Sequence, residues 1–437
     1  MTPEKSVKRQ KFIIAGLGNR GLDTFARALL GFPNYGIPEF RERSEIAAFV
    51  DINIERAKAA NAELGVSIPV YRTIPEAAAR HPADWAVIAT VDRTHADLAV
   101  AALDQGLDVF VDKPMATSVW ECNRIIDAGR RSGRRVVVGH NLRYYEDMLA
   151  LAKLVRSGAI GEVRQIEAGE VLDYTHGGSY FNRWHSEFDK SAGLMNHKCC
   201  HQLDEINWAI DDSPVMVSAM GARDYYAPRP ALKTGTRCSE CAIAKQCRHF
   251  CDLDADDGRL RRMYADVEHV DGYIRDRCVF SDRNTINDRE TLNIRYSRGA
   301  TACFSMIAYA PREYNYYNFT GHEGRLEYSV VYDRTANAGK SQIRLFHRDG
   351  RLEFIDVDSL FEGYGHGGAD VRLIADLLGM DLPGADPIQR ATPEQARNAV
   401  AIADMAARSI AGNGRCVAVE ETGRDFPPPP PRAGRAS

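Results

Sequence analysis

A glycine-rich turn near the N-terminus constrains the fold of this chain more than any other feature of its sequence. The residues IIAGLGNRG place Gly16, Gly18 and Gly21 after a short apolar run and before a helical pattern, in the spacing G-x-G-x-x-G. Glycine is needed there because the backbone turns tightly and approaches a pyrophosphate, whose charge then lies at a helix N-terminus. The turn predicts dinucleotide binding, and the alternative is a purely structural turn.

The first third of the chain alternates short β-rich runs with helical patterns. The runs KFIIAGLG, EIAAFVD, PVYR, DWAVIAT, DVFVDKP and RVVVGH are separated by helices expected from about Leu22 and over residues 53–64, 96–105 and 119–131. This rhythm is typical of a parallel, doubly wound sheet. We therefore predict an α/β Rossmann domain over residues 10–140 that binds NAD.

Beyond residue 140 the pattern changes. A helix in MLALAKLVRSG leads into a strand in EVRQIEAGEVL, an aromatic-rich loop, a helix and longer β-rich stretches such as ETLNIRYSRGATACFSMIAYA. We predict a substrate-binding α+β domain over residues 141–420, with a large, mostly antiparallel open sheet and closing helices over 371–378 and 393–411. Residues 421–437 contain a proline run and are predicted to be a disordered tail.

The charge of the chain indicates a small-molecule partner. A formal net charge of -4 gives no basic field for nucleic acid, and no run of like charge marks a membrane-binding patch. The N-terminal apolar stretch is too short for a signal peptide, and no segment approaches the roughly 18 apolar residues that a membrane span needs. We expect a cytoplasmic protein whose cysteines are reduced thiols or metal ligands.

An acidic residue at the end of the second predicted strand favours one cofactor. Asp51 ends EIAAFVD, where its carboxylate could accept hydrogen bonds from ribose hydroxyls and repel a ribose phosphate. NAD is thus favoured over NADP, although Asn53 or Arg56 could alter this choice. The structural alternative is that Asp51 is the polar end of a buried strand.

The stretch SAGLMNHKCCHQLDEINWAI gathers His197, Lys198, Cys199, Cys200 and His201 ahead of an apolar run. Such a cluster can form a metal site, a thiol redox site, a proton-transfer site or the start of an ordinary helix. In a helix the two histidines share one face, so Cys199 is predicted to belong to the core and Cys200 to border the polar face. Adjacent cysteines close a strained ring, which disfavours a redox pair.

The two histidines are also spaced as metal ligands on a helix. His176 or His185, in DYTHGGSYFNRWH, could complete such a site. The glutamate of the motif H-E-x-x-H is missing, however, and most histidine pairs of this spacing bind no metal. We therefore favour proton transfer over a catalytic metal.

A cysteine-rich insertion is predicted over residues 224–276, where the regular pattern dissolves into Pro, Gly, Asp and Cys. The segment RCSECAIAKQCRHFC has the spacing C-x2-C-x5-C-x3-C, and four thiolates in a loop with little core of its own suit a structural zinc ion. An iron-sulfur cluster, reduced thiols and a disulfide are the alternatives. The predicted ligands are Cys238, Cys241, Cys247 and Cys251.

Several motifs of the chain, GLGNRG, VFVDKPMA and RVVVGHNLRYYEDMLALAKLVRSGAIGEV, resemble those of the Gfo/Idh/MocA family of NAD(P)-dependent oxidoreductases. The resemblance runs from about Lys11 to Gly412 and extends to a subgroup with a cysteine-rich insertion. It implies a second domain whose open sheet often mediates oligomerisation, so a homo-oligomer is expected. It also implies sugars, inositols or related polyols as substrates.

The resemblance also assigns catalytic residues. The family's E-K-P motif falls on Asp112, Lys113 and Pro114, with Asp in place of Glu, and its D-x-x-x-H pattern falls on His197 and His201, with His in place of Asp. Oxidising a carbinol needs a base that takes the hydroxyl proton, and imidazole titrates in a suitable range. We expect Lys113 and His201 to form the acid/base set, and the departure at position 197 leaves open which group is the base.

The remaining site residues are expected from the same motifs and from the loops between them. For the loop residues the alternative is a segment that only seals the cleft. The predicted cofactor-binding residues are Gly16, Gly18, Asn19, Arg20, Gly21, Asp51, Thr90, His95, Asp112 and Lys113. The predicted substrate-contacting residues are Arg143, Tyr144, His176, Arg183, Trp184, His185, His197 and Lys198.

These residues predict an NAD-dependent oxidoreductase that transfers hydride between NAD and a carbinol of a sugar, polyol or sugar derivative. One alternative is a glycoside hydrolase that oxidises its substrate transiently, eliminates the aglycone and returns the hydride. Another is a non-catalytic NAD-binding sensor, and the presence of both Lys113 and His201 argues against it.

Overall fold

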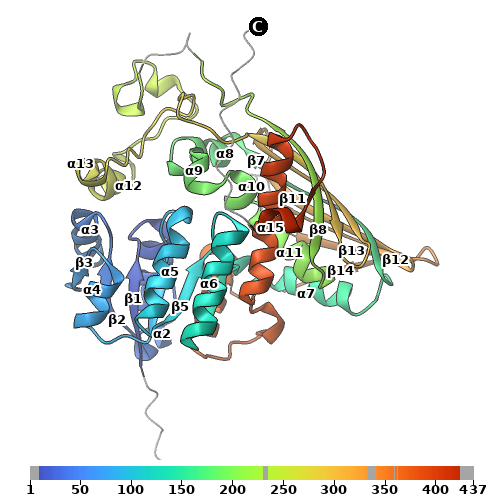
Figure 1. The fold of residues 1–437 in the computed structure, drawn as a ribbon, viewed down its shortest axis with the longest axis horizontal. Coiled ribbons are helices and arrows are strands. Elements are labelled where there is room, and N and C mark those ends of the chain that lie inside the picture. Colours follow the sequence, from blue (N-terminus) through green and yellow to red (C-terminus); the bar gives the residue numbers. More distant parts are fainter. Residues whose placement is uncertain (1–8, 230–234, 333–340, 359, 362, 424–437) are drawn as a thin grey trace, which may run out of the picture.

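The protein is described here by a computed structural model that covers residues 9–229, 235–332, 341–358, 360–361 and 363–423. It contains two sheets, and Figure 1 shows them side by side with helices packed around each. The predicted fold class, a Rossmann domain followed by a domain with a mostly antiparallel sheet, is confirmed.

The first sheet has six parallel strands in the order β3-β2-β1-β4-β5-β6. Phe12 and Ile14 of its central strand belong to the core on one face, and Ile13 and Ala15 belong to the core on the other, so helices cover both faces. The order reverses between β1 and β4, and ligands bind at the carboxyl ends of strands at such a point. The strands are β1 (Gln10–Ala15), β2 (Ser44–Val50), β3 (Val70–Tyr71), β4 (Trp85–Ile88), β5 (Asp108–Asp112) and β6 (Val136–Gly139).

Caps fix the ends of the helices between these strands. The Asn53 side chain accepts a hydrogen bond from the Arg56 N–H at the start of α3, and Gly65 ends that helix in the left-handed conformation. Ser118 caps α6 in the same way. The helices and helical turns are η1 (Asn19–Ala26), α1 (Arg27–Leu29), α2 (Pro38–Arg43), α3 (Ile54–Leu64), α4 (Ile74–Arg80), α5 (His95–Asp104) and α6 (Val119–Ser132).

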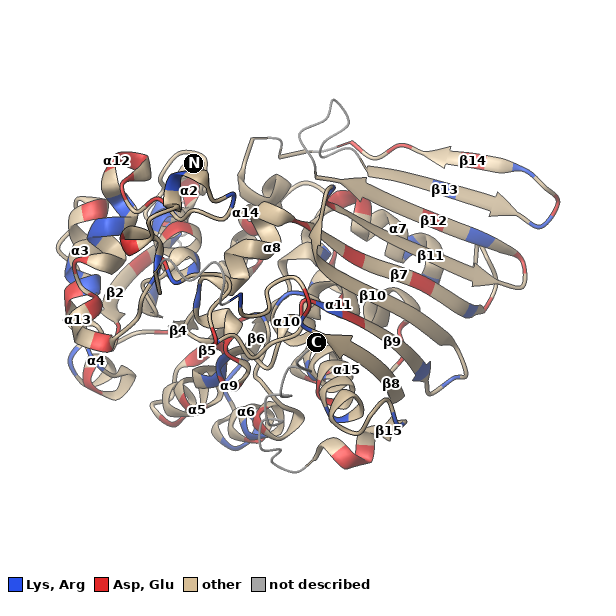
Figure 2. Cartoon of the chain, turned by 90° about the horizontal axis from the view of Figure 1, so that it is seen from above, with Lys and Arg blue, Asp and Glu red and all other residues tan. Residues whose placement is uncertain are grey.

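The second sheet has nine strands in the order β14-β13-β12-β11-β7-β10-β9-β8-β15, and only β7 and β10 pair in parallel. Exposed and buried residues alternate along β9, so one face packs on helices and the other is open. Figure 2 shows this sheet extending away from the first domain. The strands are β7 (Val163–Asp173), β8 (Pro214–Ala222), β9 (Arg289–Tyr296), β10 (Thr301–Ala310), β11 (Tyr314–Gly321), β12 (Gly324–Val331), β13 (Ser341–His347), β14 (Leu352–Ile355) and β15 (Val417–Ala418).

The helices of the second half include three long ones, α7, α11 and α15, whose buried residues join the core of this sheet. None of the described helices has the length and apolar content to cross a membrane. The helices are α7 (Glu146–Arg156), α8 (Tyr174–Phe181), α9 (Phe188–Ser191), α10 (Leu194–His197), α11 (Cys200–Ile210), α12 (Ala255–Leu260), α13 (Glu268–Asp271), α14 (Ala369–Leu377) and α15 (Pro393–Ala411).

Helix α14 packs on the first domain although it lies in the sequence range predicted for the second. Its residues Val371, Leu373 and Ile374 are buried in a core of the first domain, together with Phe12. The range 141–420 therefore includes a helix near the C-terminal end of the sequence that packs on the Rossmann domain. At the C-terminus, Val419–Thr422 forms a short helical turn in which Thr422 is buried, so residues 421 and 422 of the predicted tail are helical. Residues 424–437 lie outside the described residues.

The aromatic stretch that was expected as a loop is helix α8. Asp173 caps it by accepting hydrogen bonds from the backbone N–H groups of Thr175 and His176. Gly177 brings the helix against the second sheet, since a Cβ there would lie 1.8 Å from the carbonyl oxygen of Ala308. The cap and the glycine together explain a helix in a sequence with little helical periodicity.

The histidine stretch folds as two helices, α10 and α11, with a break at Lys198 and Cys199. Cys199 is fully buried in the core, as predicted. Cys200 is also fully buried, and its thiol donates to the carbonyl oxygen of His197 at 3.5 Å, so it does not border a polar surface.

Candidate active site

The glycine turn has the geometry of a phosphate cradle. Gly16 has a φ of +91°, and a Cβ there would lie 2.4 Å from the carbonyl oxygen of Ala89. A Cβ on Gly21 would lie 1.8 Å from the carbonyl oxygen of Gly16, so both positions exclude other residues. The atom nearest to a Cβ built on Gly18 is the Tyr264 hydroxyl oxygen, at 3.8 Å. Helical turn η1 begins there with no side-chain cap, so its first N–H groups can bind a phosphate.

Asp51 is held at the carboxyl end of β2, where the sequence placed it. Its carboxylate accepts hydrogen bonds from the backbone N–H groups of Leu17 at 2.9 Å and Asn53 at 2.8 Å, and the Arg56 guanidinium lies 3.6 Å away. Burial raises the pKa of Asp51, and Arg56 opposes this shift. The carboxylate is thus fixed beside the glycine turn, where a ribose would follow the phosphates.

Two residues predicted to contact the cofactor, Arg20 and Asp112, form an ion pair with each other. The Arg20 Nε donates to Asp112 at 2.9 Å, and its Nη1 pairs with Asp370 of α14 at 3.1 Å. This network ties η1, β5 and α14 together. The network positions the turn that follows β5, and the expected cofactor contacts of Arg20 and Asp112 stay a prediction.

His95 also braces this turn. Its Nδ1 lies 2.9 Å from the carbonyl oxygen of Pro114, and its Nε2 lies 3.3 Å from that of Thr90. Burial lowers the pKa of His95. Both ring nitrogens face backbone oxygens, so His95 supports the Lys113–Pro114 turn, and its contact with the cofactor stays a prediction.

Lys113 lies next to the histidine stretch, although 84 residues separate it from His197. Its Nζ donates to the carbonyl oxygen of His197 at 3.1 Å. The His197 Nδ1 in turn lies 2.7 Å from the carboxylate of Asp92, which is buried on the turn after β4. A carboxylate accepts hydrogen bonds, so this contact leaves Nε2 of His197 with a lone pair. Sequence reasoning missed Asp92, whose only signal was its place after a strand that ends at the same sheet edge.

His201 follows on α11 and is nearly buried. No hydrogen-bond partner meets its Nδ1 among the residues that the structure describes. Burial, with the positive charges of Lys113 and Lys198 nearby, holds the pKa of His201 well below its usual value. The imidazole is therefore neutral at physiological pH and able to accept a proton.

Aromatic side chains of α8 and the turn after it form the outer wall of the site. The ring of His185 lies 4.1 Å from that of His197 and 3.8 Å from that of Trp184, measured between centroids. Tyr180 packs edge-on against both histidines. Arg183 donates to the Ser179 carbonyl oxygen and lies over the Tyr180 ring, so its guanidinium supports this wall.

A buried ion pair lies at the other side of the histidines. Lys198 Nζ lies 3.2 Å from a carboxylate oxygen of Glu170 on β7, and the second oxygen of Glu170 has no hydrogen-bond partner in the described structure. His176 Nδ1 lies 2.7 Å from Glu313. Glu170 was not predicted, because it lies on a strand whose pattern reads as ordinary sheet. These groups are suited to bind hydroxyl groups of a polar ligand.

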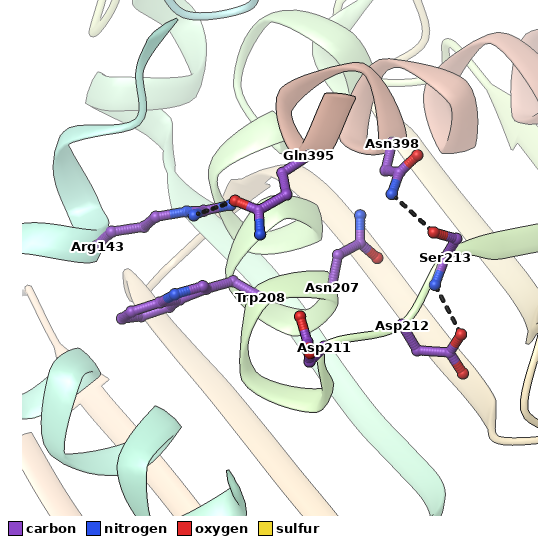
Figure 3. A pocket seen from close by; sticks show the side chains of 8 residues that line it. All are labelled: Arg143, Asn207, Trp208, Asp211, Asp212, Ser213, Gln395 and Asn398. Carbon is purple, nitrogen blue, oxygen red and sulfur yellow. Dashed lines mark hydrogen bonds between the residues drawn. The ribbon is translucent and has the colours of Figure 1, made fainter. Parts of the chain in front are cut away.

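Arg143 and Tyr144 are bound to buried or partly buried partners in this structure, and their predicted contact with substrate stays a prediction. Arg143 is fully buried and donates two hydrogen bonds to Asp204, at 2.6 and 2.7 Å, and one to Gln395 at 3.0 Å. Figure 3 shows Arg143 and Gln395 at the edge of a small cavity of about 80 Å³ on α11. The Tyr144 hydroxyl donates to Asp376 at 2.7 Å. Both side chains join α11, α14 and α15 to the end of the Rossmann domain.

The four cysteines of the insertion are not arranged as the predicted zinc site. In the described ranges, no group of three or more His, Cys, Asp or Glu side chains is placed to hold a metal ion. Burial raises the pKa of Cys238 to about 12 and also raises the pKa values of Cys251 and Cys278. The spacing in the sequence supplied suitable ligand types but did not determine whether the four thiols converge.

Two family models match the chain. The model of the oxidoreductase family NAD-binding Rossmann fold matches residues 10–140, and the model of its C-terminal alpha/beta domain matches residues 152–419. The chain belongs to the Gfo/Idh/MocA oxidoreductase family. The suspected family and the predicted enzyme class, an NAD(P)-dependent oxidoreductase, are confirmed.

Known proteins similar to this Gfo/Idh/MocA oxidoreductase include YteT of Bacillus subtilis, named as an oxidoreductase, which is 28% identical over 75% of this chain and 79% of YteT. An inositol 2-dehydrogenase of Klebsiella pneumoniae is 31% identical over 38% of this chain and 47% of its own length, so only about half of that relative is matched. The fold is similar to that of the aldose-aldose oxidoreductase of Caulobacter crescentus, with a TM-score of 0.61 and 18% identity over 94% of this chain and 100% of that chain.

Proposed function

We propose that this Gfo/Idh/MocA oxidoreductase uses NAD to oxidise or reduce a carbinol carbon of a sugar, polyol or sugar derivative. The observation that carries the proposal is the contact of Lys113, which follows β5 at the carboxyl edge of the Rossmann sheet, with the backbone of His197, close enough to His201 for its charge to act on that ring. Gly16, Gly18, Gly21 and Asp51 would hold NAD, which supplies a hydride acceptor and donor when bound.

The chain's own residues would move the proton. In the oxidation direction, the hydroxyl proton of the substrate passes to a neutral histidine while its oxygen accepts a hydrogen bond from Lys113. His201 is the first candidate for this base, since its buried ring lies near Lys113 and its Nδ1 has no hydrogen-bond partner in the described structure. His197 is the second, because Asp92 orients it as carboxylates orient catalytic imidazoles.

A sugar or polyol suits the walls of the site. The Trp184 ring offers an apolar face to the C–H side of a sugar ring, and Lys198, Glu170 and His176 offer donors and acceptors to its hydroxyls. The similarity to inositol 2-dehydrogenases and to an aldose-aldose oxidoreductase supports this class of substrate.

The open face of the second sheet supports the proposal of a homo-oligomer. Along β9 and β10 alternate residues are exposed on this face, and a hollow of about 410 Å³ lies over them. A broad sheet surface of this kind can be covered by the same surface of a second copy.

A redox-assisted glycosidase is the second candidate, because the site holds more proton-transfer groups than one oxidation needs. Besides Lys113 and His201, the neutral histidines His185 and His197 lie with their rings in contact. Oxidation of the carbinol acidifies the neighbouring C–H; loss of that proton with elimination of the aglycone, addition of water to the double bond and return of the hydride would each use such groups.

A substrate panel tests the proposed function. Purified protein with added NAD is expected to form NADH, or to exchange hydride between two substrates, with at least one inositol, aldose or alditol; absorbance at the NADH band and product chromatography measure this. Aryl glycosides in the same panel test the second candidate, which predicts aglycone release without net NADH. Inactivity with every carbinol and every glycoside at millimolar concentration would contradict both.

A further inference from the structure

The cysteine-rich insertion continues into a segment that packs on the Rossmann domain. We call residues 252–273 the clasp; it contains α12 and α13, and Figure 1 shows both above α3 of the first domain. The clasp belongs in sequence to the second domain, between β8 and β9. Its contacts with the Rossmann domain are therefore formed across more than 190 residues of chain.

Ion pairs dock the α12 end of the clasp. Arg259 Nη2 lies 2.6 Å from Asp23 of η1, and its Nε lies 3.3 Å from Glu63 of α3. Arg262 Nη2 lies 3.2 Å from the other oxygen of Glu63. Met263, the next residue, is buried in a core of the first domain. The clasp is thus a packed part of the Rossmann domain's surface.

Two buried residues at the start of α3 dock the rest of the clasp. The Asn53 Nδ2 donates to the Val267 carbonyl oxygen at 2.8 Å, and the Arg56 Nε donates to that of Met263 at 3.3 Å. Arg56 Nη2 pairs with Asp271 at 2.7 Å. These are the residues that immediately follow Asp51, so the clasp reaches the end of the strand that carries the ribose-binding carboxylate.

The clasp also faces the glycine turn. The Tyr264 hydroxyl is the atom nearest to a Cβ built on Gly18, and it donates to the side-chain oxygen of Asn19 at 3.4 Å. The Arg56 guanidinium lies over the rings of Tyr264 and Tyr273, with its carbon 5.5 and 5.8 Å from their centroids. One segment therefore covers both the phosphate-binding turn and the ribose-binding end of β2.

We propose that the clasp is the outer wall of the dinucleotide site, with Tyr264 facing the phosphate-binding turn and Asp271 adding a second carboxylate beside Asp51, so that the chain selects NAD and releases it slowly. The proposal rests on the proposed function, which supplies the cofactor. A bound dinucleotide would leave either after the docking contacts of the clasp open or by sliding out beneath the clasp, and the clasp slows release by either route.

The charges around Arg56 explain the selection. An unpaired Arg56 would attract a ribose 2'-phosphate. Its guanidinium is paired, however, with Nη1 3.6 Å from a carboxylate oxygen of Asp51 and Nη2 2.7 Å from one of Asp271. Two carboxylates beside one guanidinium more than balance its charge, so that they oppose the binding of the NADP phosphate by Arg56. Removing Asp271 would leave Arg56 with less compensating charge and improve NADP binding.

The rate of cofactor release tests the clasp. The full-length protein is loaded with NADH, and release is followed by the loss of bound NADH fluorescence after a chase with excess ADP-ribose. Tyr264→Ala and the double variant Arg259→Ala/Arg262→Ala are each expected to release NADH roughly tenfold faster or more, since both weaken contacts that must hold while the cofactor stays bound. The matched control is Arg261→Ala, which removes an arginine that pairs only within the clasp, with Asp254, and is expected to release NADH at the unaltered rate.

Equilibrium titrations with NADH and NADPH complete the test. Asp271→Ala is expected to reduce the preference for NADH over NADPH by roughly tenfold. Unaltered release from both clasp variants, or an unaltered cofactor preference in Asp271→Ala, would overturn the corresponding part of the inference. Binding of neither NADH nor NADPH by the unaltered protein would instead overturn the proposed function, and the inference with it.

Discussion

Lys113→Ala and His201→Ala are each expected to lower turnover by roughly a hundredfold or more, because each removes a group that binds or takes the reacting proton. NADH binding, measured by fluorescence titration, should persist in both variants, since the glycine turn and Asp51 are untouched. Steady-state rates on the substrate found in the panel measure the loss.

Lys153→Ala is the matched control for the loss of a lysine. Lys153 lies on the exposed face of α7 and pairs with Asp386 at 2.7 Å. Its variant should keep turnover within a factor of about two, as for most surface ion pairs. Near-normal turnover in the Lys113 or His201 variant would remove that residue from the proposed acid/base set.

Arg143→Ala is expected to have the largest effect on stability among the residues of the site region, lowering the free energy of unfolding by about 3–5 kcal/mol. The reason is that the substitution leaves the buried carboxyl group of Asp204 without the guanidinium that pairs with it. Urea unfolding followed by fluorescence measures this loss through the shift of the midpoint.

The double variant Arg143→Met/Asp204→Leu separates a stability role from substrate binding. It removes both charges together, so most of the stability should return. A substrate-contacting arginine would give the opposite pattern: Arg143→Ala would leave the urea midpoint within about 1 kcal/mol of the unaltered protein and would raise KM.

Much of the fold could be predicted because its signals are local. The glycine turn requires positive φ at Gly16 and a close approach at Gly21, and both are read directly from the residue type. Helix α15 was predicted at its observed bounds, because Thr392 caps its start and its apolar residues keep one period. The return of α14 to the first domain has no such signal, since it depends on which core an apolar face meets.

The site was predictable only where a motif fixes a position relative to a strand end. Lys113 follows β5 and is brought to the histidine stretch by the sheet edge, but the contact of Asp92 with His197 joins residues 105 positions apart. Arg143 was predicted to contact substrate because the sequence gives no sign of its ion pair with Asp204, which lies far along the chain. The partner of a buried charged side chain is set by the three-dimensional fold, so it cannot be predicted from residue type alone.

The contacts that place the cysteine-rich insertion could not be predicted from the sequence either. Its cysteines are conspicuous in the sequence and suggested a metal, whereas the contacts that place it come from Arg259, Arg262 and Met263, which belong to an unremarkable polar stretch. The docking partners lie on η1 and α3, so the role of this segment follows only from the fold.

Hydride transfer to bound NAD is the central claim, and a single-turnover isotope measurement tests it most directly. Enzyme loaded with one equivalent of NAD is mixed with the identified sugar or polyol carrying deuterium at its carbinol carbon, quenched within one turnover, and the nicotinamide is examined by mass spectrometry. The account predicts deuterium on the nicotinamide of bound NAD in the unaltered protein, and far less in His201→Ala. Substrate turnover that leaves the nicotinamide without deuterium would contradict it.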